Sequence, residues 1–384
     1  MDKVRIGDIC TVVSGSTPKS NIEEYWNGDI KWITPAEITD DSYVISDTER
    51  HITEKAVEKT NLTLLPVGTV LLSSRAPIGK TAIVGAEMYC NQGFKNLICS
   101  ERIYNKYLYF FLTSKVDYLN ALGRGATFKE ISKGIVEDVE IPLPSLDEQK
   151  KIAERFEAIQ QLLNKRKQAL LYLDNLVKSR FIEMFGDPVM NPMGWEVKKL
   201  KDLSLKISDG VHAKPNYTED GKPFISVVNI TTGHIDFSNC KFVSQEDYEK
   251  MIKSTHPEKG DVLYTKVGAT YGIPAYVDTD EDFCLYVSVC LIKPKHELVN
   301  ARFLTESMRL PYIKHQADRR IRGIGVPDLH LNQIREFDIV CPPLDLQERY
   351  MEFVDLVDKS KLAVQQSIET LQTLKAKLMQ DYFG

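Results

Sequence analysis

Apolar residues recur at alternating steps of four and three in two long segments of the chain. The first stripe comprises Ile152, Phe156, Ile159, Leu163, Leu170, Leu173, Val177 and Met184. The second comprises Tyr350, Val354, Val357, Val364, Ile368, Leu371, Leu378 and Tyr382. This heptad spacing, with charged and amide residues crowding both flanks, predicts two helices of about 40 residues, each roughly 60 Å long. A two-stranded coiled coil explains the narrow stripes; two separate core helices are the alternative.

The rest of the chain alternates short apolar runs with turn residues. Strand-like runs cover residues 69–74, 81–84 and 95–99 in the first half, and 261–264, 275–277 and 285–292 in the second. Helical patterns follow at residues 105–120 and 300–316. The pattern predicts a mixed, strand-rich globular head before each long helix.

The two halves of the chain resemble each other. Residues 144–186 return without a gap, 198 positions later, as residues 342–384. Identical pairs at this offset include Pro144/Pro342, Asp147/Asp345, Gln149/Gln347, Glu154/Glu352, Gln168/Gln366, Leu173/Leu371, Leu176/Leu374, Phe185/Phe383 and Gly186/Gly384. Two copies with a period of half the chain indicate a covalent pseudo-dimer.

The predicted fold is α+β: two pseudo-symmetric, strand-rich mixed domains, each followed by a long helix, with the helices forming an antiparallel coiled coil. A chain of 384 residues is longer than one hydrophobic core usually serves. The expected boundaries are 1–141 for the first head, 142–186 for the first helix, 187–339 for the second head and its linker, and 340–384 for the second helix. An antiparallel pair places the second head at one end of the rod and the first head at the other.

Composition narrows the possible functions. The formal charge of −5 gives no global signature of a nucleic-acid binder, so any such site must be a local basic patch. The seven cysteines are scattered, without the Cys/His spacing of a zinc site. No apolar run approaches the roughly 18 residues of a membrane helix. We therefore expect a reduced, cytoplasmic protein that is neither secreted nor embedded.

One segment partly matches a catalytic motif. Residues 74–81 read Ser-Arg-Ala-Pro-Ile-Gly-Lys-Thr and end like a phosphate-binding loop. They lack its first glycine, and Pro77 removes a backbone donor. A turn between two strands that presents Arg75 and Lys80 is the preferred interpretation. With no other catalytic motif in view, the sequence favours binding and positioning.

Several motifs, taken in order, resemble the specificity subunits of Type I restriction-modification enzymes. They are the Pro-Leu-Pro-Ser-Leu-Asp-Glu-Gln entry to the first helix (142–149), Phe-Gly-Asp-Pro (185–188), Asn-Pro-Met-Gly-Trp (191–195) and Pro-Pro-Leu-Asp-Leu-Gln (342–347). The first head adds Ser-Gly-Ser-Thr-Pro (14–18), Trp-Ile-Thr-Pro (32–35) and Arg-Ala-Pro-Ile-Gly (75–79). The second head departs from this pattern, with Ser-Asp-Gly at 208–210 in place of the Ser-Gly turn and no Arg-x-Pro-Ile-Gly.

The resemblance implies a non-catalytic DNA-binding subunit. Each head would read one half of a bipartite site in double-stranded DNA, and the helices would set the spacing. The helices would also dock methyltransferase subunits, expected to number two, that methylate adenine; restriction subunits would join the complex. S-adenosylmethionine, ATP and Mg²⁺ would belong to these partners, with no cofactor bound by this chain. The alternatives are a stand-alone two-headed DNA-binding regulator and a coiled-coil scaffold without enzymatic partners.

Candidate DNA contacts are chosen for residue type and for their place in loops. Phosphate contacts need Lys, Arg or backbone donors, and base reading needs polar side chains that reach a groove. A solvated surface charge is the alternative for any single basic residue. The candidates in the first head are Ser16, Thr17, Lys19, Arg75, Lys80, Arg124, Thr127 and Lys129. Those in the second head are His212, Lys214, Lys266, Tyr271, Arg319, Arg320 and Arg322.

Overall fold

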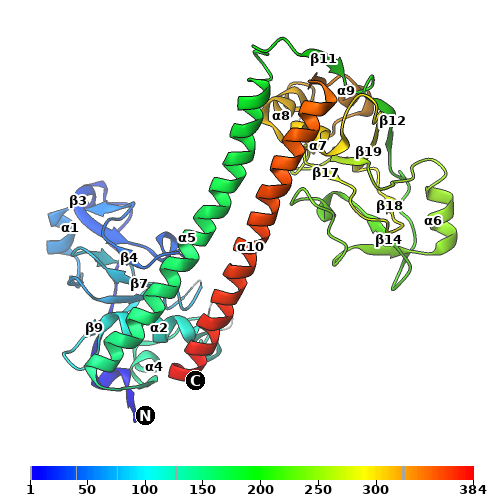
Figure 1. The fold of residues 1–384 in the computed structure, drawn as a ribbon. Helices are drawn as coiled ribbons and strands as arrows, with labels where there is room; N and C mark the ends of the chain where they lie inside the picture. The colour runs from blue at the N-terminus through cyan, green and yellow to red at the C-terminus, as the bar shows by residue number, and fades with distance from the viewer. Residues whose placement is uncertain (1, 40, 76, 126–128, 322–324) are drawn as a thin grey trace. The chain divides into compact units, whose positions relative to one another are not determined.

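The computed structural model describes residues 2–39, 41–75, 77–125, 129–321 and 325–384. The chain forms two compact units. Unit 1 comprises residues 1–168 and 365–384, and unit 2 comprises residues 169–364. The long helices α5 (Leu146–Phe185) and α10 (Leu344–Phe383) each contribute one part to either unit (Figure 1). Each unit therefore combines one head with helical segments from both sequence repeats.

The described residues of head 1 form three sheets. The largest has the strand order β2-β9-β6-β7-β4, the second β5-β3-β8, and the third pairs β1 with β10. The strands are β1 (Lys3–Arg5), β2 (Cys10–Ser14), β3 (Trp26–Ile33), β4 (Val44–Ile45), β5 (His51–Ile52), β6 (Val70–Leu72), β7 (Thr81–Val84), β8 (Tyr89–Cys90), β9 (Lys95–Cys99) and β10 (Glu140–Pro142). The helices are α1 (Glu54–Lys59), α2 (Asn105–Ser114), α3 (Val116–Leu122) and α4 (Lys133–Glu137), with 3₁₀ turns η1 (Ile6–Asp8), η2 (Glu23–Tyr25) and η3 (Pro35–Glu37).

Head 2 repeats this plan with small differences. Its sheets have the orders β12-β19-β16-β17, β13-β15-β14-β18 and β11-β20. The strands are β11 (Glu196–Lys199), β12 (Ser204–Asp209), β13 (Tyr217–Thr218), β14 (Lys222–Ile225), β15 (Lys241–Val243), β16 (Val262–Thr265), β17 (Pro274–Tyr276), β18 (Cys284–Leu285), β19 (Val289–Pro294) and β20 (Asp338–Cys341). The helices are α6 (Gln245–Met251), α7 (Ala301–Arg309), α8 (Pro311–Asp318) and α9 (Leu331–Arg335), with the 3₁₀ turn η4 (Val227–Asn229).

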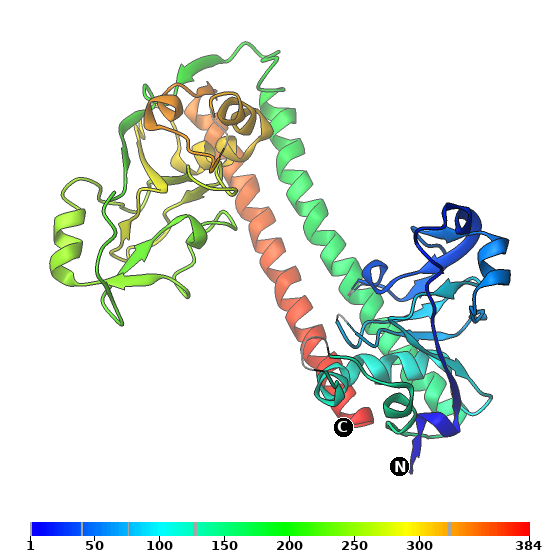
Figure 2. The same cartoon turned by 180° about the vertical axis from the view of Figure 1, so that it is seen from behind.

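The long helices pack together within each unit, and they do so in opposite directions. In unit 1 the start of α5, with Ile152 and Phe156, shares a core with Phe383 at the end of α10. In unit 2 the end of α5, with Phe181, shares a core with Tyr350 near the start of α10. Seen from both sides, the C-terminal end of α10 lies beside the first part of α5 and the helices of head 1 (Figure 2). The predicted α+β fold, with two strand-rich heads and two packed long helices, is confirmed.

Phe185 and Phe383 are an identical pair of the sequence repeat. Phe185, at the end of α5, packs into the core of head 2, and Phe383, at the end of α10, packs into the core of head 1. Phe383 is 1% exposed and its ring lies 5.3 Å from the ring of Tyr107 on α2. Phe185 is also 1% exposed and lies 5.3 Å from Phe303 on α7. Burying an aromatic side chain stabilises by roughly 1.5–3 kcal/mol. Each unit thus depends on a helix end supplied by the other half of the sequence.

Gln149 and Gln347 join each long helix to its own head. The Oε1 atom of Gln149 accepts a hydrogen bond from the backbone N–H of Tyr104 at 2.8 Å, and that of Gln347 accepts one from Asn300 at 2.8 Å. Both bonds satisfy the backbone just before a head helix, α2 or α7, whose first N–H groups have no partner within the helix. Both glutamines are fully buried. A buried amide needs these partners, which explains why the repeat keeps glutamine at this position.

Candidate nucleic-acid interface

Strand pairing identifies which residues of the two heads occupy equivalent places. Leu97 of β9 pairs with both Val12 and Val70, and Ile292 of β19 pairs in the same way with Ile207 and Val262. Counting along the strands from these pairs makes Ser14 equivalent to Asp209 and Lys95 equivalent to Cys290. The candidate contact residues fall on three loops that can be compared in this way.

The first loop follows β2 in head 1 (residues 14–19) and β12 in head 2 (residues 209–214). Its second residue must be glycine, because a Cβ atom would lie 1.8 Å from the carbonyl oxygen of Asn91 at Gly15 and 2.1 Å from that of Leu285 at Gly210. The next backbone N–H groups donate to Cys90 at 3.0 Å and to Leu285 at 2.9 Å. The candidates Ser16, Thr17 and Lys19 of head 1 therefore lie in a loop equivalent to the one that carries His212 and Lys214 in head 2.

Two tryptophans hold the first loop of head 1. The indole N–H of Trp32 donates to the carbonyl oxygen of Ser16 at 3.1 Å, and that of Trp26 donates to the carbonyl oxygen of Lys19 at 3.3 Å. The Arg50 guanidinium lies 4.2 Å from the centre of the Trp26 ring and 5.2 Å from that of Trp32. These bonds fix the backbone of the loop at both ends. Thr17 additionally donates a hydrogen bond to the side chain of Gln92.

The second loop connects β6 to β7 in head 1 and β16 to β17 in head 2. A hydroxyl at its start fixes both loops: Ser73 Oγ accepts from the backbone N–H of Lys80 at 2.8 Å, and Thr265 Oγ1 accepts from that of Ile273 at 2.8 Å. The Gly-Lys-Thr segment is therefore part of a turn between two antiparallel strands, as predicted. Lys80 Nζ donates to the carbonyl oxygen of Pro35 at 3.0 Å. In head 2, Tyr271 donates from its hydroxyl to Asp318 at 2.5 Å.

The third loop precedes α4 in head 1 (residues 123–125 and 129–130) and α9 in head 2 (residues 319–321 and 325–328). Arg124 and Lys129 are exposed, and Arg124 exchanges backbone hydrogen bonds of 3.0 and 2.9 Å with Glu130. Arg319 is exposed at the end of α8, and no hydrogen bond or ion pair of its side chain is found in the described part of the chain. Thr127 and Arg322 lie outside the described residues.

Two of the candidate cations are already engaged inside unit 2. Arg320 donates to the carbonyl oxygens of Gln316 at 2.8 Å and Glu336 at 3.1 Å. Lys266 is only 4% exposed, and its Nζ lies 3.7 Å from an Asp209 carboxylate oxygen and 3.6 Å from one of Asp328. Burial raises the pKa of the Asp209 carboxyl, an effect that the charges of Lys266 and His212 oppose. Both cations contact groups of neighbouring loops, whereas Arg319 and Lys214 are exposed, and Lys214 Nζ lies 5.9 Å from the centre of the Tyr217 ring.

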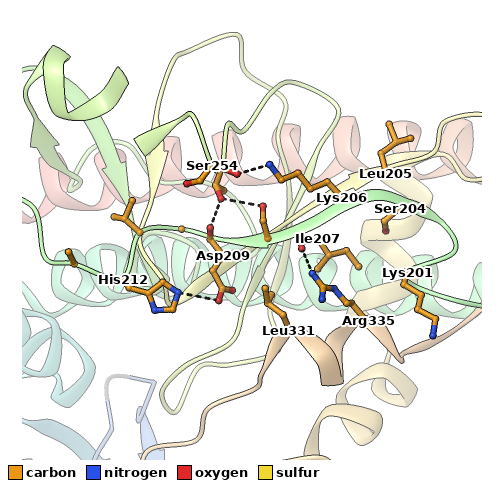
Figure 3. Close-up of a pocket in the computed structure, with 15 residues that line it drawn as sticks. Lys201, Ser204, Leu205, Lys206, Ile207, Asp209, His212, Ser254, Leu331 and Arg335 are labelled. Atoms are coloured by element: carbon orange, nitrogen blue, oxygen red, sulfur yellow. Dashed lines mark hydrogen bonds and ion pairs between the residues drawn. The ribbon is translucent and has the colours of Figure 1, made fainter. Parts of the chain in front are cut away.

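A groove of about 890 Å³ runs along β12, the edge strand of its sheet in head 2. Its lining includes the basic side chains Lys201, Lys206, His212 and Arg335. Figure 3 shows Arg335 and Leu331 reaching from α9 toward β12, with Lys206 turned toward Ser254. Arg335 donates to the carbonyl oxygen of Ile207 at 2.9 Å, and Lys206 to that of Ser254 at 2.6 Å. The groove includes residues of the first loop of head 2; Asp209 adds a carboxylate to its lining, and Lys201 pairs with Glu336 at 2.6 Å.

Of the basic groove residues, the sequence analysis proposed His212 but missed Lys201, Lys206 and Arg335; it also missed Lys95, Glu130 and the two tryptophans as site residues. Lys201, Lys206 and Arg335 are single basic residues far apart in the sequence, so no local pattern groups them. Trp32 is part of the Trp-Ile-Thr-Pro motif, which could have indicated a role near the first loop.

None of the helices formed by the described residues is long and apolar enough to cross a membrane. Within the same part of the chain, no group of three or more His, Cys, Asp and Glu side chains could hold a metal ion.

Comparisons with known proteins agree on one family. The model of the Type I restriction modification DNA specificity domain matches residues 1–172 and 192–373. The Type I restriction enzyme MjaIX specificity subunit of Methanocaldococcus jannaschii is 30% identical, over 98% of this chain and 91% of that protein.

Solved structures share the fold. A chain from a structure addressing complex assembly and conformational transition of the type I R-M system has a TM-score of 0.66 at 19% identity, covering 100% of this chain and 97% of that one. The type I S subunit of M. genitalium has a TM-score of 0.57 at 14% identity, covering 100% and 96%. With both halves matched by the family model and one relative similar over its length, the chain belongs to the family of Type I restriction-modification specificity subunits, the non-catalytic, DNA-specificity component of these enzymes.

Proposed function

We propose that each unit reads one half of a bipartite DNA site and that the two halves differ in sequence. The observation that carries this proposal is the equivalence of the three loops in the two heads, combined with their unlike side chains. Equivalent loops supply the same kind of contact surface, because both heads share the same strand pairing. Different side chains on that surface select different bases, since discrimination comes from groups that reach the base edges.

Within this surface the exposed lysines and arginines are assigned to the phosphates. Lys19, Arg124, Lys129, Lys214 and Arg319 are exposed, so they can contact phosphates. The remaining described candidates contact bases or hold the loops: Ser16, Thr17, Arg75, Lys80, His212, Lys266, Tyr271 and Arg320. The basic groove along β12 extends the phosphate-binding surface of head 2. Thr127 and Arg322 keep their proposed roles on sequence grounds alone.

The long helices are proposed to set the distance between the half-sites and to dock two methyltransferase subunits. Those subunits would bind S-adenosylmethionine and methylate adenine, and restriction subunits would use ATP and Mg²⁺. The family membership of this chain supports such a complex. The net charge of −5 disfavours nonspecific DNA binding by this chain alone, because nonspecific affinity depends on neutralising phosphates, so the proposal expects tighter binding in the complex.

Mapping of modified adenines by long-read sequencing, in host DNA with the gene intact and with it deleted, tests the proposal. We expect one bipartite motif with unlike halves to lose its methylation on deletion. An unchanged set of methylated motifs, in a host whose partner subunits are active, would contradict it.

A further inference from the structure

We propose that one buried lysine in each unit, Lys95 in unit 1 and Lys266 in unit 2, is a positioning residue that holds the three contact loops of its head together. The inference rests on the proposed function, because it concerns how the loops are kept ready to read DNA. Its basis is geometric: in each head, partners from different loops meet at a single ammonium group.

In unit 1 the lysine lies on β9. Lys95 is 8% exposed; its Nζ lies 3.1 Å from Glu130 Oε1 in the third loop and 3.4 Å from Ser74 Oγ in the second. Lys95 itself pairs in register with Ser14, where the first loop begins. Arg75 of the second loop adds a longer contact, 4.0 Å, to the same Glu130 carboxylate. One ammonium group therefore connects β9, and through it the first loop, to the other two loops.

In unit 2 the lysine lies on the second loop itself. Lys266 contacts Asp209 at the start of the first loop and Asp328 in the third, at 3.7 and 3.6 Å. Asp209 also lies 3.8 Å from the exposed ring of His212, on the surface of the first loop (Figure 3). The loop that carries His212 is thereby attached to the cluster.

The two lysines occupy non-equivalent positions. Lys266 stands where head 1 has Ser74, since the backbone N–H of Leu329 donates to Lys266 and that of Ile131 donates to Ser74. Lys95 stands where head 2 has Cys290. What the heads share is one buried ammonium group at the meeting point of the loops, with an acidic partner in the third loop at equivalent sites, Glu130 and Asp328.

A buried charge is costly unless it is paired, and ordinary packing could be achieved with apolar side chains. A paired charge instead fixes the relative placement of its partners, which is the best-attested use of such groups. We therefore expect loss of either lysine to loosen the loops of its own head and to leave the other head unaffected.

The test uses the full chain assembled with its methyltransferase subunits, and scores methylation of DNA duplexes with one base changed in one half-site. In the Lys266→Ser variant we expect discrimination at the half-site of head 2 to fall about tenfold, the scale of one mismatched base pair. Discrimination at the other half-site should stay within about twofold. Lys95→Ser is the matched variant and should show the reverse pattern.

A double variant, Lys266→Ser with Cys290→Lys, moves the ammonium group of head 2 to the position it has in head 1. We expect it to restore discrimination toward the wild-type value. Equal losses at both half-sites in either single variant would overturn the inference, because they indicate general unfolding. So would a double variant no better than Lys266→Ser. A wild-type complex with no bipartite motif would instead overturn the proposed function, and the inference with it.

Discussion

The first loop is attached to its head in both units, but by different side chains. In head 1, two indole N–H groups bind the carbonyl oxygens of Ser16 and Lys19. In head 2, Phe224 occupies the place of Trp32 in the parallel strand pair and has no N–H to donate. The first loop of head 2 is attached instead through Asp209, whose carbonyl oxygen accepts from Thr255 and whose carboxylate faces Lys266.

The two heads share their scaffold and differ in their three contact loops. The features that recur are the buried pairs Gln149 with Gln347, Ser73 with Thr265 and Phe185 with Phe383, and the tightly packed glycines Gly15 and Gly210. The features that differ lie on or directly below the loops. If the loops read DNA as proposed, one head can change its half-site without a change in the packing that joins it to the helices.

The largest effects on stability are expected at Phe383 and Phe185, where the end of a long helix completes the core of a head. Replacing a buried phenylalanine with alanine costs about 3–5 kcal/mol of unfolding free energy. We expect Phe383→Ala to accelerate hydrogen exchange in α2 of head 1, and Phe185→Ala to accelerate it in α7 of head 2. The two variants are controls for each other. Faster exchange confined to head 1 in Phe185→Ala would refute the crosswise assembly of the units.

The neighbouring residues Arg319 and Arg320 should behave differently although the sequence does not distinguish them. Arg320→Ala removes two charge-assisted hydrogen bonds to backbone carbonyls, and we expect unit 2 to lose about 2 kcal/mol of stability in denaturant unfolding. Arg319→Ala should change stability by less than about 0.5 kcal/mol while weakening DNA binding. Loss of stability in Arg319→Ala with none in Arg320→Ala would reverse the assignment.

Trp32→Phe makes head 1 resemble head 2 at the first loop. The variant loses one hydrogen bond, worth about 1 kcal/mol, and keeps most of the buried ring. We expect the assembled complex to bind about fivefold more weakly to DNA. Discrimination should decline at the half-site of head 1 alone, so the other half-site is the internal control. Equal changes at both half-sites would show that the tryptophan acts on the whole chain.

The smallest effects concern single exposed lysines of the first loops. Lys19→Ala and Lys214→Ala should each weaken binding of all DNA sequences alike and reduce the slope of log affinity against log salt by about one. Titrations at several salt concentrations measure this slope. A change in sequence preference with an unchanged slope would assign these lysines to base contacts.

The sequence predicted the parts of the fold that follow from the regular spacing of apolar residues and from the internal repeat. The heptad stripes and the gap-free repeat of residues 144–186 indicate two similar helices because burial on one face imposes that spacing. Residue type was enough to predict candidate DNA contacts, and these candidates lie on equivalent loops in the two heads. The buried lysines could not be matched, because Lys95 and Lys266 stand at different positions and their acidic partners are distant in sequence. The difference between Arg319 and Arg320 likewise depends on which side chain reaches the carbonyl oxygens of Gln316 and Glu336.

The most direct test of the account is a chain made of two copies of head 1. Residues 197–384 are replaced by a second copy of residues 3–186, a splice that the equivalence of Ile6 and Leu200 places in register. Adenine methylation is then mapped with the same partner subunits. If each unit reads its own half-site, the methylated motif becomes an inverted repeat of the half-site read by head 1. A motif that retained two unlike halves would contradict the account.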